Sequence, residues 1–148
     1  MKIIPADEAR RDAWLALRRA LWPTCTAAES AQEIAGILRS HREGAFLALH
    51  ESGTLVGFAE LSTREYVDGC HSSPVGYLEG IYVAPGYRNR GVGRALVAVG
   101  EAWAKSKGCA EMGSDTLLDN TESQAFHRSV GFREAERHVV FVKSINHG

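Results

Sequence analysis

A predicted strand, a glycine- and arginine-rich turn and a predicted helix follow one another without interruption between residues 75 and 108. Residues 75–83 are rich in apolar and aromatic side chains and end at an Ala-Pro pair, which is typical of a strand and its end. Apolar residues from Leu96 to Trp103 then recur at helical spacing, and Gly108 can end the helix. This change from strand to helix predicts a mixed α/β domain.

The rest of the chain predicts further elements on both sides of this unit. Asp7 can cap a helix that stops near Trp22, and Thr26 with Glu29 has the form of a capping box that starts a second helix. Apolar and turn patterns predict strands at residues 45–50, 55–62, 109–115 and 135–142 and a last helix at residues 120–130. The expected fold class is α/β of the α+β type, with a mixed central sheet flanked by about four helices.

Length and composition predict one domain, residues 1–148, with one core. A chain of 148 residues with 45% hydrophobic content buries roughly two-thirds of its unfolded surface. The 17 basic and 18 acidic residues nearly cancel, which argues against a nucleic-acid or membrane-surface protein. Cys25, Cys70 and Cys109 form no C-x-x-C pair, and there is no secretory signal or apolar span. A cytoplasmic protein with reduced thiols is expected.

The turn between the strand and the helix is suited to an anion. The start of a helix offers about four unpaired N–H donors and a partial positive charge. Here Gly91 and Gly93 stand among Arg88, Arg90 and Arg94. Phosphate is the natural ligand of such a turn. The alternative is that the glycines only allow a tight connection and that the arginines are solvated.

Two other phosphate-binding motifs do not fit this turn. Gly86 and Gly91 have Walker A spacing, but Val92 and Gly93 replace the Lys-Ser/Thr pair that binds the phosphates and magnesium. Leu96 stands where the dinucleotide-binding fingerprint requires a third glycine. Both motifs are therefore excluded.

The run Arg88-Asn89-Arg90-Gly91-Val92-Gly93 resembles the acetyl-coenzyme A signature R/Q-x-x-G-x-G/A of the GNAT superfamily of N-acetyltransferases. A later stretch, from Asn120 to Gly131-Phe132, resembles the second signature of that superfamily, and together the similarity spans nearly the whole chain. The resemblance implies the GNAT fold, acetyl-CoA as cosubstrate, and a strand that splays from its neighbour to bind the pantetheine arm. The residues implied in coenzyme binding are Ile81, Tyr82, Val83, Arg88, Asn89, Arg90, Gly91, Val92, Gly93, Arg94, Asn120 and His127.

One position departs from the pattern of that superfamily. Many members have a tyrosine four residues before the glycine of the second signature, where its hydroxyl can protonate the departing coenzyme A thiolate. This chain has His127 there. Imidazole can also donate a proton near neutral pH, which makes His127 a candidate catalytic residue. The alternative is that His127 only packs against the coenzyme or hydrogen-bonds to it.

Glu79 is the leading candidate for the residue that serves the amine. A primary alkyl ammonium must lose a proton before it attacks a thioester, at a cost of roughly 4 to 5 kcal/mol at pH 7. A carboxylate can position the amine and accept that proton directly or through water. By period-two alternation, Glu79 is expected on the same strand face as Ile81. The alternative is a surface-exposed strand glutamate.

Further stretches resemble the aminoglycoside 6'-N-acetyltransferases within this superfamily: Leu21-Trp22-Pro23, Ser72-Ser73-Pro74, Leu78-Glu79-Gly80-Ile81 and Ser114-Asp115-Thr116. The resemblance implies acetyl transfer to the 6'-amine of these antibiotics, which confers resistance, and a homodimer, often formed through C-terminal strands. The residues implied in substrate binding are Trp22, Tyr66, Glu79, Asp115 and Glu136. The alternatives are a core or helix-end position for Trp22, an exposed aromatic for Tyr66, a cap or turn for Asp115 and a solvated strand position for Glu136.

The expected mechanism is direct attack of the neutral amine on the thioester in a ternary complex, with backbone N–H groups near Ile81 polarising the thioester carbonyl. No covalent intermediate is expected, because Cys70 and Cys109 lack a recognisable partner histidine and Ser114 lacks a G-x-S-x-G turn. The 6 histidines show no metal-ligand spacing, so no metal is expected.

Two alternatives to this function stay open. The same fold can acetylate another small amine, a polyamine or a protein N-terminus. A member of a different functional class would bind acyl-CoA without turnover and act as a sensor. The presence of Glu79 and Asp115 argues against the sensor.

Overall fold

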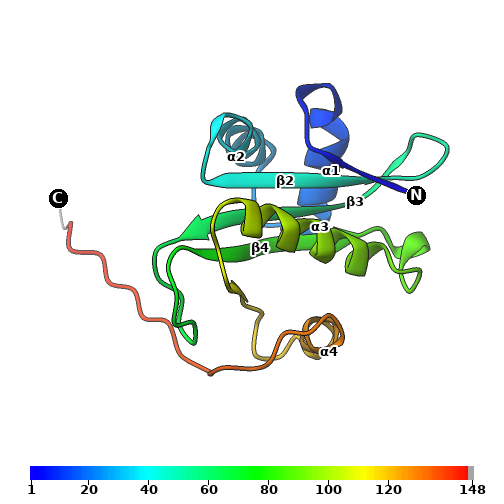
Figure 1. Ribbon diagram of the computed structural model, residues 1–148. Coiled ribbons are helices and arrows are strands. Elements are labelled where there is room, and N and C mark those ends of the chain that lie inside the picture. The colour runs from blue at the N-terminus through cyan, green and yellow to red at the C-terminus, as the bar shows by residue number, and fades with distance from the viewer. Residues whose placement is uncertain (147–148) are drawn as a thin grey trace. The chain divides into compact units, whose positions relative to one another are not determined.

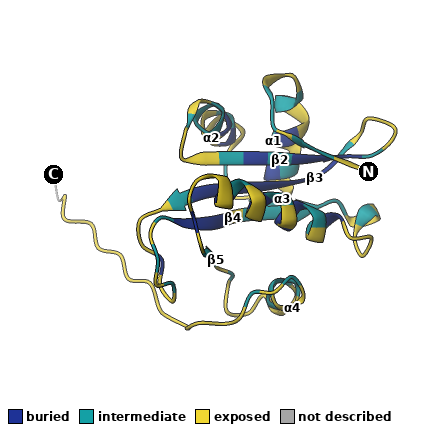
Figure 2. Cartoon of the chain, in the orientation of Figure 1, coloured by how far each residue is buried: buried dark blue, intermediate teal, exposed yellow. Residues whose placement is uncertain are grey.

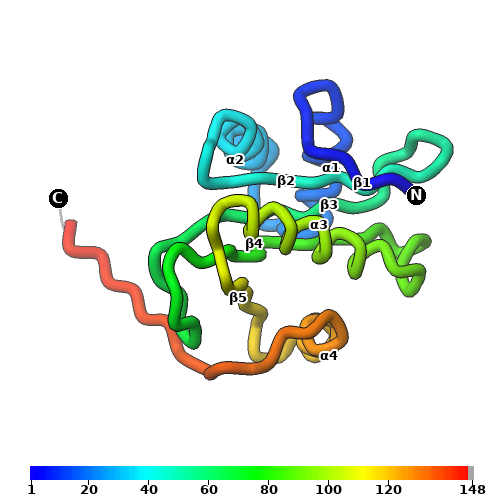
Figure 3. The backbone as a smooth tube through the Cα atoms, in the orientation of Figure 1, coloured from blue at the N-terminus to red at the C-terminus, as the bar shows by residue number. Residues whose placement is uncertain are grey.

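The computed structural model describes residues 1–146 and divides the chain into two compact units, Met1–Asp115 and the residues from Thr116 on. The first unit contains one five-stranded sheet in the order β1-β2-β3-β4-β5 (Figures 1 and 3). Neighbouring strands are antiparallel from β1 to β4, and β5 is parallel to β4. The strands are β1 (Lys2–Pro5), β2 (Glu43–Leu49), β3 (Leu55–Arg64), β4 (Val75–Val83) and β5 (Met112–Ser114).

Helices cover both faces of this sheet. The helical segments of the first unit are η1 (Glu8–Arg10), α1 (Arg11–Leu21), α2 (Ala27–Arg39), η2 (Pro85–Tyr87) and α3 (Val92–Ser106). Gly80 faces Leu21 and Trp22 at the end of α1, whereas Gly57 and Gly76 face Leu96 and Ala104 of α3. α1 and α2 therefore lie on one face of the sheet and α3 on the other (Figure 1). Within the described residues, no helix is both long and apolar enough to cross a membrane.

The core of the first unit lies between the sheet and these helices. Trp14, Ile34, Leu47 and Phe58 have no exposed surface and pack together between α1, α2 and the sheet. On the opposite face, Leu61 packs against the backbone of α3 at Gly100, where an added Cβ would lie 2.7 Å from Leu61. The buried residues, dark blue in Figure 2, follow the strands through the middle of the sheet. This rigid packing determines which strand positions can carry functional groups.

Local patterns predicted several of these elements well. The capping box is present: the Thr26 side chain accepts from the Glu29 N–H, and the Glu29 side chain accepts from the Thr26 N–H. The central strand β4 has the predicted bounds. The Asp7 side chain caps the short η1 in front of α1 rather than α1 itself. The N-terminal strand β1 was not predicted, because four residues are too few to show alternation.

Among the described residues of the second unit, α4 (Thr121–Ser129) is the one helix, and residues 133–146 have no assigned secondary structure. The predicted strand at residues 135–142 is wrong for this structure, since that segment has no assigned secondary structure. Val139, Val140, Phe141 and Val142 are 75%, 75%, 89% and 92% exposed, as the colouring of this segment in Figure 2 shows. The pattern of the residues suits a strand, but a strand exists only where another strand accepts its backbone hydrogen bonds.

Candidate active site

A β-bulge in β4 places Glu79. Glu60 of β3 lies opposite Gly80, and the next residue, Leu61, lies opposite Leu78, so Glu79 has no residue opposite it. An extra residue of this kind changes the direction of the side chains around it. Both Glu79 and Gly80 consequently face the side of the sheet covered by α1, where Glu79 contacts Ser62 and an added Cβ on Gly80 would meet Trp22.

The expectation that Glu79 shares a strand face with Ile81 is therefore wrong. Ile81 lies opposite Ala59, and the next β3 residue, Glu60, directs its side chain to Trp14 of α1. Ala59 and Ile81 thus belong to the α3 face, because cross-strand partners share a face and neighbours along a strand alternate. Period-two alternation fails here because the bulge adds one residue between Leu78 and Gly80.

The Glu79 carboxylate is held by two side chains of β3. The Ser62 hydroxyl donates to Oε2 over 2.5 Å, and Nη2 of Arg64 lies 2.9 Å from both Oε1 and Oε2. The Arg64 and Glu79 side chains are 44% and 35% exposed. Ser62 is buried, so it fixes the carboxylate from the sheet side, while Arg64 covers it toward solvent.

Arg64 and Tyr77 connect Glu79 to Asp115. The Arg64 guanidinium lies 3.6 Å from the centroid of the Tyr77 ring, and the Tyr77 side chain hydrogen-bonds to Asp115 at the end of β5. Burial, together with the negative charge of Asp115, raises the pKa of Tyr77 well above its ordinary value. The two carboxylates predicted from sequence thus belong to one connected cluster, which we call the Glu79–Asp115 cluster: Ser62, Arg64, Tyr77, Glu79 and Asp115.

Sequence reasoning missed Ser62, Arg64 and Tyr77. A signal was present, because Ser62 and Arg64 follow Glu60 at intervals of two along β3 and therefore share its face. The cluster contains two carboxylates and one guanidinium, which leaves one net negative charge. That charge suits a cationic ligand.

Trp22 lies beside this cluster, at the end of α1. It is half-buried, and Gly80 allows its close approach, since an added Cβ there would lie 2.4 Å from the Trp22 ring. The Arg18 guanidinium lies 4.9 Å from the Trp22 ring centroid. Phe58 packs against Trp22 with 6.0 Å between the two ring centroids. Trp22 therefore has both an anchored face in the core and a partly exposed surface.

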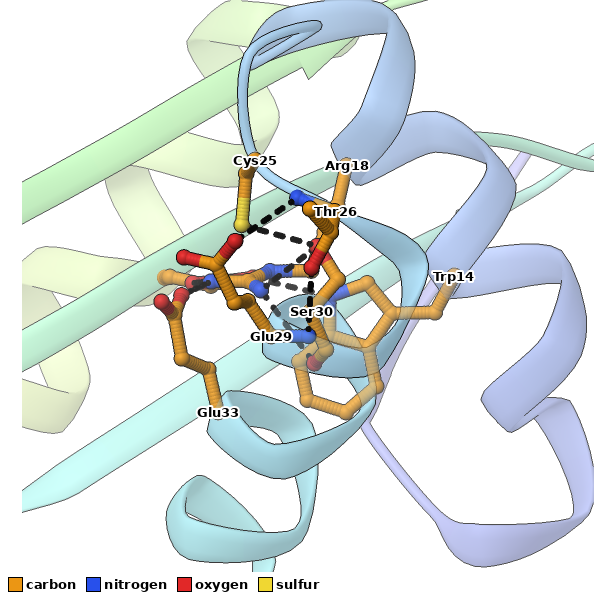
Figure 4. A network of polar contacts seen from close by, with 8 residues as sticks. Trp14, Arg18, Cys25, Thr26, Glu29, Ser30 and Glu33 are labelled. Carbon is orange, nitrogen blue, oxygen red and sulfur yellow. Dashed lines mark hydrogen bonds and ion pairs between the residues drawn. The ribbon is translucent and has the colours of Figure 1, made fainter.

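Arg18, which lies over the Trp22 ring, forms a buried ion pair with Glu60. Arg18 donates through Nε to Glu60 over 2.7 Å, and Trp14 Nε1 donates to the same Glu60 oxygen over 2.9 Å. Arg18 also bonds to Ser30 and Glu33 of α2 (Figure 4). Burial raises the pKa of the Glu60 carboxyl, against the opposing effect of Arg18. Burial acts to lower the pKa of Arg18, but Glu60 and Glu33 outweigh it and the pKa is raised.

Tyr66 lies in the connection between β3 and β4 and is 73% exposed. Its hydroxyl donates to Asp68 over 2.8 Å. Glu111, just before β5, accepts from the backbone N–H groups of His71 and Ser72 and from the Ser72 hydroxyl, which fastens the far end of the same connection. The Ser72 hydroxyl, with the His71 N–H after it, lowers the pKa of the Glu111 carboxyl.

The glycine turn in front of α3 has the geometry of an anion site. Gly91 caps the helix with φ 82° and without a side-chain hydrogen bond, and Asn89 has φ 62°. The first intrahelical bond runs from the Ala95 N–H to the Gly91 carbonyl, so the N–H groups of Val92 and Gly93 have no acceptor within the helix. Together with the positive end of the helix dipole, these donors fit the pyrophosphate of a coenzyme.

The three arginines of this turn differ in what they do. Arg88 donates through Nε to the Val83 carbonyl over 2.7 Å, and its guanidinium lies 5.4 Å from the Tyr82 ring centroid. Arg88 therefore connects the turn to the end of β4. Arg90 lies 5.8 Å from the Tyr87 ring centroid and is exposed, as is Arg94. Arg88 thus has a structural task here, and Arg90 and Arg94 present their charge at the surface.

The pairing between β4 and β5 stops before the end of β4. The parallel ladder consists of Gly76–Met112, Tyr77–Gly113 and Leu78–Ser114 and goes no further. Among the described residues, the β5-facing edge of Ile81, Tyr82 and Val83 therefore has no strand partner. An extended ligand can hydrogen-bond to such an edge as an added strand would.

Three predicted site residues lie in the second unit. Asn120 accepts from the Ser123 N–H and caps α4. Nδ1 of His127 lies 2.7 Å from the Ser123 carbonyl oxygen, which requires a proton on Nδ1, so the neutral ring carries none on Nε2. Glu136 is exposed, with Oε1 3.8 Å from Nδ1 of His138. As long as the ring is neutral, His127 can act at Nε2 only as an acceptor.

Comparison with known proteins identifies the family. The profile of the Acetyltransferase (GNAT) family matches residues 8–132. The chain is 44% identical to the aminoglycoside N(6')-acetyltransferase type 1 of Serratia marcescens, over 97% of this chain and 99% of that protein. The protein of the same name from Acinetobacter genomosp. 13 is also 44% identical, over 98% of this chain and 99% of its own length.

Solved structures agree with these relatives. The apo crystal structure of the aminoglycoside 6'-N-acetyltransferase AAC(6')-IG from Acinetobacter haemolyticus has a TM-score of 0.94 at 43% identity, covering 99% of this chain and 100% of that one. AAC(6')-Iy, solved in complex with the bisubstrate analog CoA-S-monomethyl-acetylneamine, has a TM-score of 0.93 at 40% identity, covering 97% of each chain. The mixed five-stranded sheet with its helices is therefore the GNAT fold, and the chain belongs to the GNAT acetyltransferase family.

Proposed function

We propose that this protein transfers the acetyl group of acetyl-CoA to the 6'-amine of aminoglycoside antibiotics. The observation that carries the proposal is the Glu79–Asp115 cluster, which brings two carboxylates together beside the open edge of β4. This chain matches nearly the whole length of the relatives named aminoglycoside N(6')-acetyltransferase, which supports the same substrate class.

Glu79 takes the central role in this proposal. Its carboxylate binds the 6'-ammonium and accepts its proton, directly or through water, and the neutral amine then attacks the thioester carbonyl. The new C–N bond forms as the C–S bond breaks, the nitrogen releases its second proton to water, and the coenzyme A thiolate leaves. Asp115 binds a second ammonium group of the substrate. Trp22 and Tyr66 form part of the sugar-facing wall, and Glu136 adds a third negative charge.

The coenzyme lies along the end of β4 and the turn before α3. Backbone groups of Ile81, Tyr82 and Val83 bind the pantetheine arm, and N–H groups near Ile81 polarise the thioester carbonyl. The N–H groups of Val92 and Gly93 bind the pyrophosphate. The remaining residues proposed to contact the coenzyme are Arg88, Asn89, Arg90, Gly91, Arg94, Asn120 and His127.

His127 is proposed as the proton donor to the thiolate. With Nδ1 bonded to the Ser123 carbonyl, the proton must come from Nε2, and the ring must therefore be an imidazolium before the transfer. Replacement by asparagine removes this proton while keeping a polar side chain. We expect His127→Asn to lower kcat by about tenfold or more, since general acids contribute about 10²- to 10⁴-fold in enzymes. An unchanged kcat would leave His127 with a packing role.

We further propose a single-domain cytoplasmic protein that confers resistance and forms a homodimer through its C-terminal segment. Val139, Val140, Phe141 and Val142 are four consecutive exposed apolar residues, which a second copy can cover. Sedimentation equilibrium tests the dimer. Phe141→Asp should shift the protein to the monomer, whereas a wild-type monomer would contradict the proposal.

The deciding experiment measures coenzyme A thiol release with four acceptors: a kanamycin-type aminoglycoside, its 6'-hydroxyl counterpart, spermidine and a peptide amine. Turnover confined to the substrate with a 6'-amine is the expected result. Activity on spermidine or the peptide alone would keep the family and contradict the aminoglycoside assignment. Coenzyme binding without any turnover would contradict the enzyme assignment.

A further inference from the structure

Arg64 places a positive charge where the proposed function requires a cationic substrate. Its Nη2 lies 2.9 Å from both oxygens of Glu79, the carboxylate assigned to the reacting amine. An ammonium that approaches Glu79 therefore meets a guanidinium on the same carboxylate. Like charges at such distances repel, and the partial exposure of Arg64 weakens the repulsion without removing it.

The guanidinium also offers hydrogen-bond donors that the protein does not use. Arginine has five N–H donors in a planar fork. In the described part of the chain, the hydrogen bonds of Arg64 use Nη2 alone, while the ring of Tyr77 holds the guanidinium at 3.6 Å. Nε and Nη1 remain for oxygen atoms that a ligand brings beside its amine.

We propose that Arg64 is a specificity-determining residue that admits amines flanked by oxygen atoms, such as aminosugars, and excludes plain polyamines. The inference rests on the proposed function, because it takes Glu79 as the group that binds the amine. An aminosugar carries hydroxyl and ether oxygens within a few bonds of its amine, and these accept from the guanidinium. A polyamine carries only ammonium groups and methylenes. It is repelled by Arg64 and has no oxygen atom that could accept a hydrogen bond from the guanidinium.

The surroundings of Arg64 support selection by this residue. Ser62 already holds Glu79 from the buried side, so the carboxylate does not depend on Arg64 alone for its position. Without Arg64, the cluster would present the charges of Glu79 and Asp115 with no local cation to oppose them. Such a pair of carboxylates attracts any polycation, including polyamines.

The test compares Arg64→Met with Arg64→Lys in coenzyme A thiol release, using a kanamycin-type aminoglycoside as substrate and spermidine as competitive inhibitor. Arg64→Met removes the charge and should tighten spermidine inhibition by about tenfold, since the repulsion between the guanidinium and the spermidine ammonium groups is lost. Its kcat/KM for the aminoglycoside should fall, because the substrate oxygen atoms lose their hydrogen-bond donors.

Arg64→Lys separates charge from shape. It keeps the charge, so spermidine inhibition should stay near the wild-type value, while kcat/KM for the aminoglycoside should fall because the fork is lost. Arg39→Gln, at an exposed arginine in the last turn of α2, is the matched control and should change neither quantity.

Unchanged spermidine inhibition in Arg64→Met would overturn the inference. An equal tightening for spermidine and the aminoglycoside would also overturn it, since that result indicates simple attraction without selection. A purely structural role for Arg64 would lower kcat and thermal stability in both variants and leave the ratio of the two ligands unchanged. No turnover of any aminoglycoside by the wild-type protein would instead contradict the proposed function itself.

Discussion

Two arginine–glutamate pairs occupy the same face of the β3–β4 ladder and differ mainly in burial. The Arg18 and Glu60 side chains are 3% and 5% exposed, whereas those of Arg64 and Glu79 are 44% and 35% exposed. Glu60 lies opposite Gly80, directly beside Glu79 across the bulge. The sheet therefore carries one ion pair inside the core and one at its surface, a few residues apart.

The comparison shows how burial decides what an ion pair can do. Glu60 is enclosed by Arg18 and Trp14, so no ligand can replace its partners. The removal of one partner from such a pair leaves a buried charge and is strongly destabilising. The Glu79 side chain is 35% exposed, so a ligand can reach it from solvent, and its ion pair with Arg64 adds little to stability. The buried pair is suited to stabilising the fold, and the exposed pair can be reached by a ligand.

The sharpest way to break this comparison is to apply one substitution to both arginines. Arg18→Met should lower the free energy of unfolding by about 3 to 5 kcal/mol, because it leaves Glu60 buried without its guanidinium. Arg64→Met should lower it by about 1 kcal/mol at most, as for exposed pairs. Urea unfolding followed by circular dichroism measures both values.

A double variant serves as the control for this experiment. Arg18→Met combined with Glu60→Leu removes both charges and should recover much of the stability lost in Arg18→Met. A loss below about 1 kcal/mol in Arg18→Met alone would show that the pair is not a structural element.

The same contrast can be drawn with an isosteric change of the two glutamates. Glu79→Gln should lower kcat/KM by about 100-fold or more, the contribution expected of a general base, with little change in stability. Glu60→Gln should lower the free energy of unfolding by about 1 to 3 kcal/mol, because Arg18 loses its buried counter-ion. Thiol release and urea unfolding on both variants provide the four values. A Glu79→Gln protein with wild-type turnover would remove Glu79 from the mechanism.

Gly80 joins the two regions, so its replacement should affect both. An added Cβ would lie 2.4 Å from the Trp22 ring, closer than any real contact, and Trp22 would have to move. We expect Gly80→Ala to cost about 1 to 3 kcal/mol of stability, as overpacked sites do, and to raise the KM for the aminoglycoside. Gly36→Ala is the control, because a Cβ there meets nothing within 4 Å. Equal behaviour of the two variants would show that the approach of Trp22 to the strand is not required.

The smallest expected effect concerns the surface carboxylate of Glu111. Its pKa is lowered, first by the Ser72 hydroxyl, so its contribution to stability is present above the unfolded pKa and is lost as the pH falls through the folded value. The difference in urea midpoint between wild type and Glu111→Gln should therefore be present at about pH 6 and shrink below about pH 4. A difference that does not depend on pH would contradict the role of the charge.

Local sequence signals predicted what depends on neighbouring residues. The capping box of Thr26 and Glu29, the bounds of β4 and the turn at Gly91 all follow from residues a few positions apart. Glu79 was chosen as a carboxylate of the central strand that could accept a proton from an amine, and Asp115 came from the family resemblance. Both belong to one connected cluster in the structure.

Features that depend on distant residues were not predicted. Arg18 and Glu60 are 42 positions apart, and an arginine in an amphipathic helix suggests a solvated side chain until the strand that receives it is known. The bulge is a property of two strands in register, so β4 alone does not reveal it. The segment at residues 135–142 has a strand pattern, but the pattern does not supply the partner strand.

The bulge in β4 makes the fit of Trp22 beside the acidic group depend on residue number as much as on residue type. With one residue fewer between Leu78 and Ile81, regular alternation would place a glutamate that follows Leu78 on the α1 face with no extra glycine beside it, and Trp22 would lose the gap at Gly80 into which it fits. A single-residue deletion in this strand would therefore keep the glutamate on its face and displace the aromatic side chain beside it.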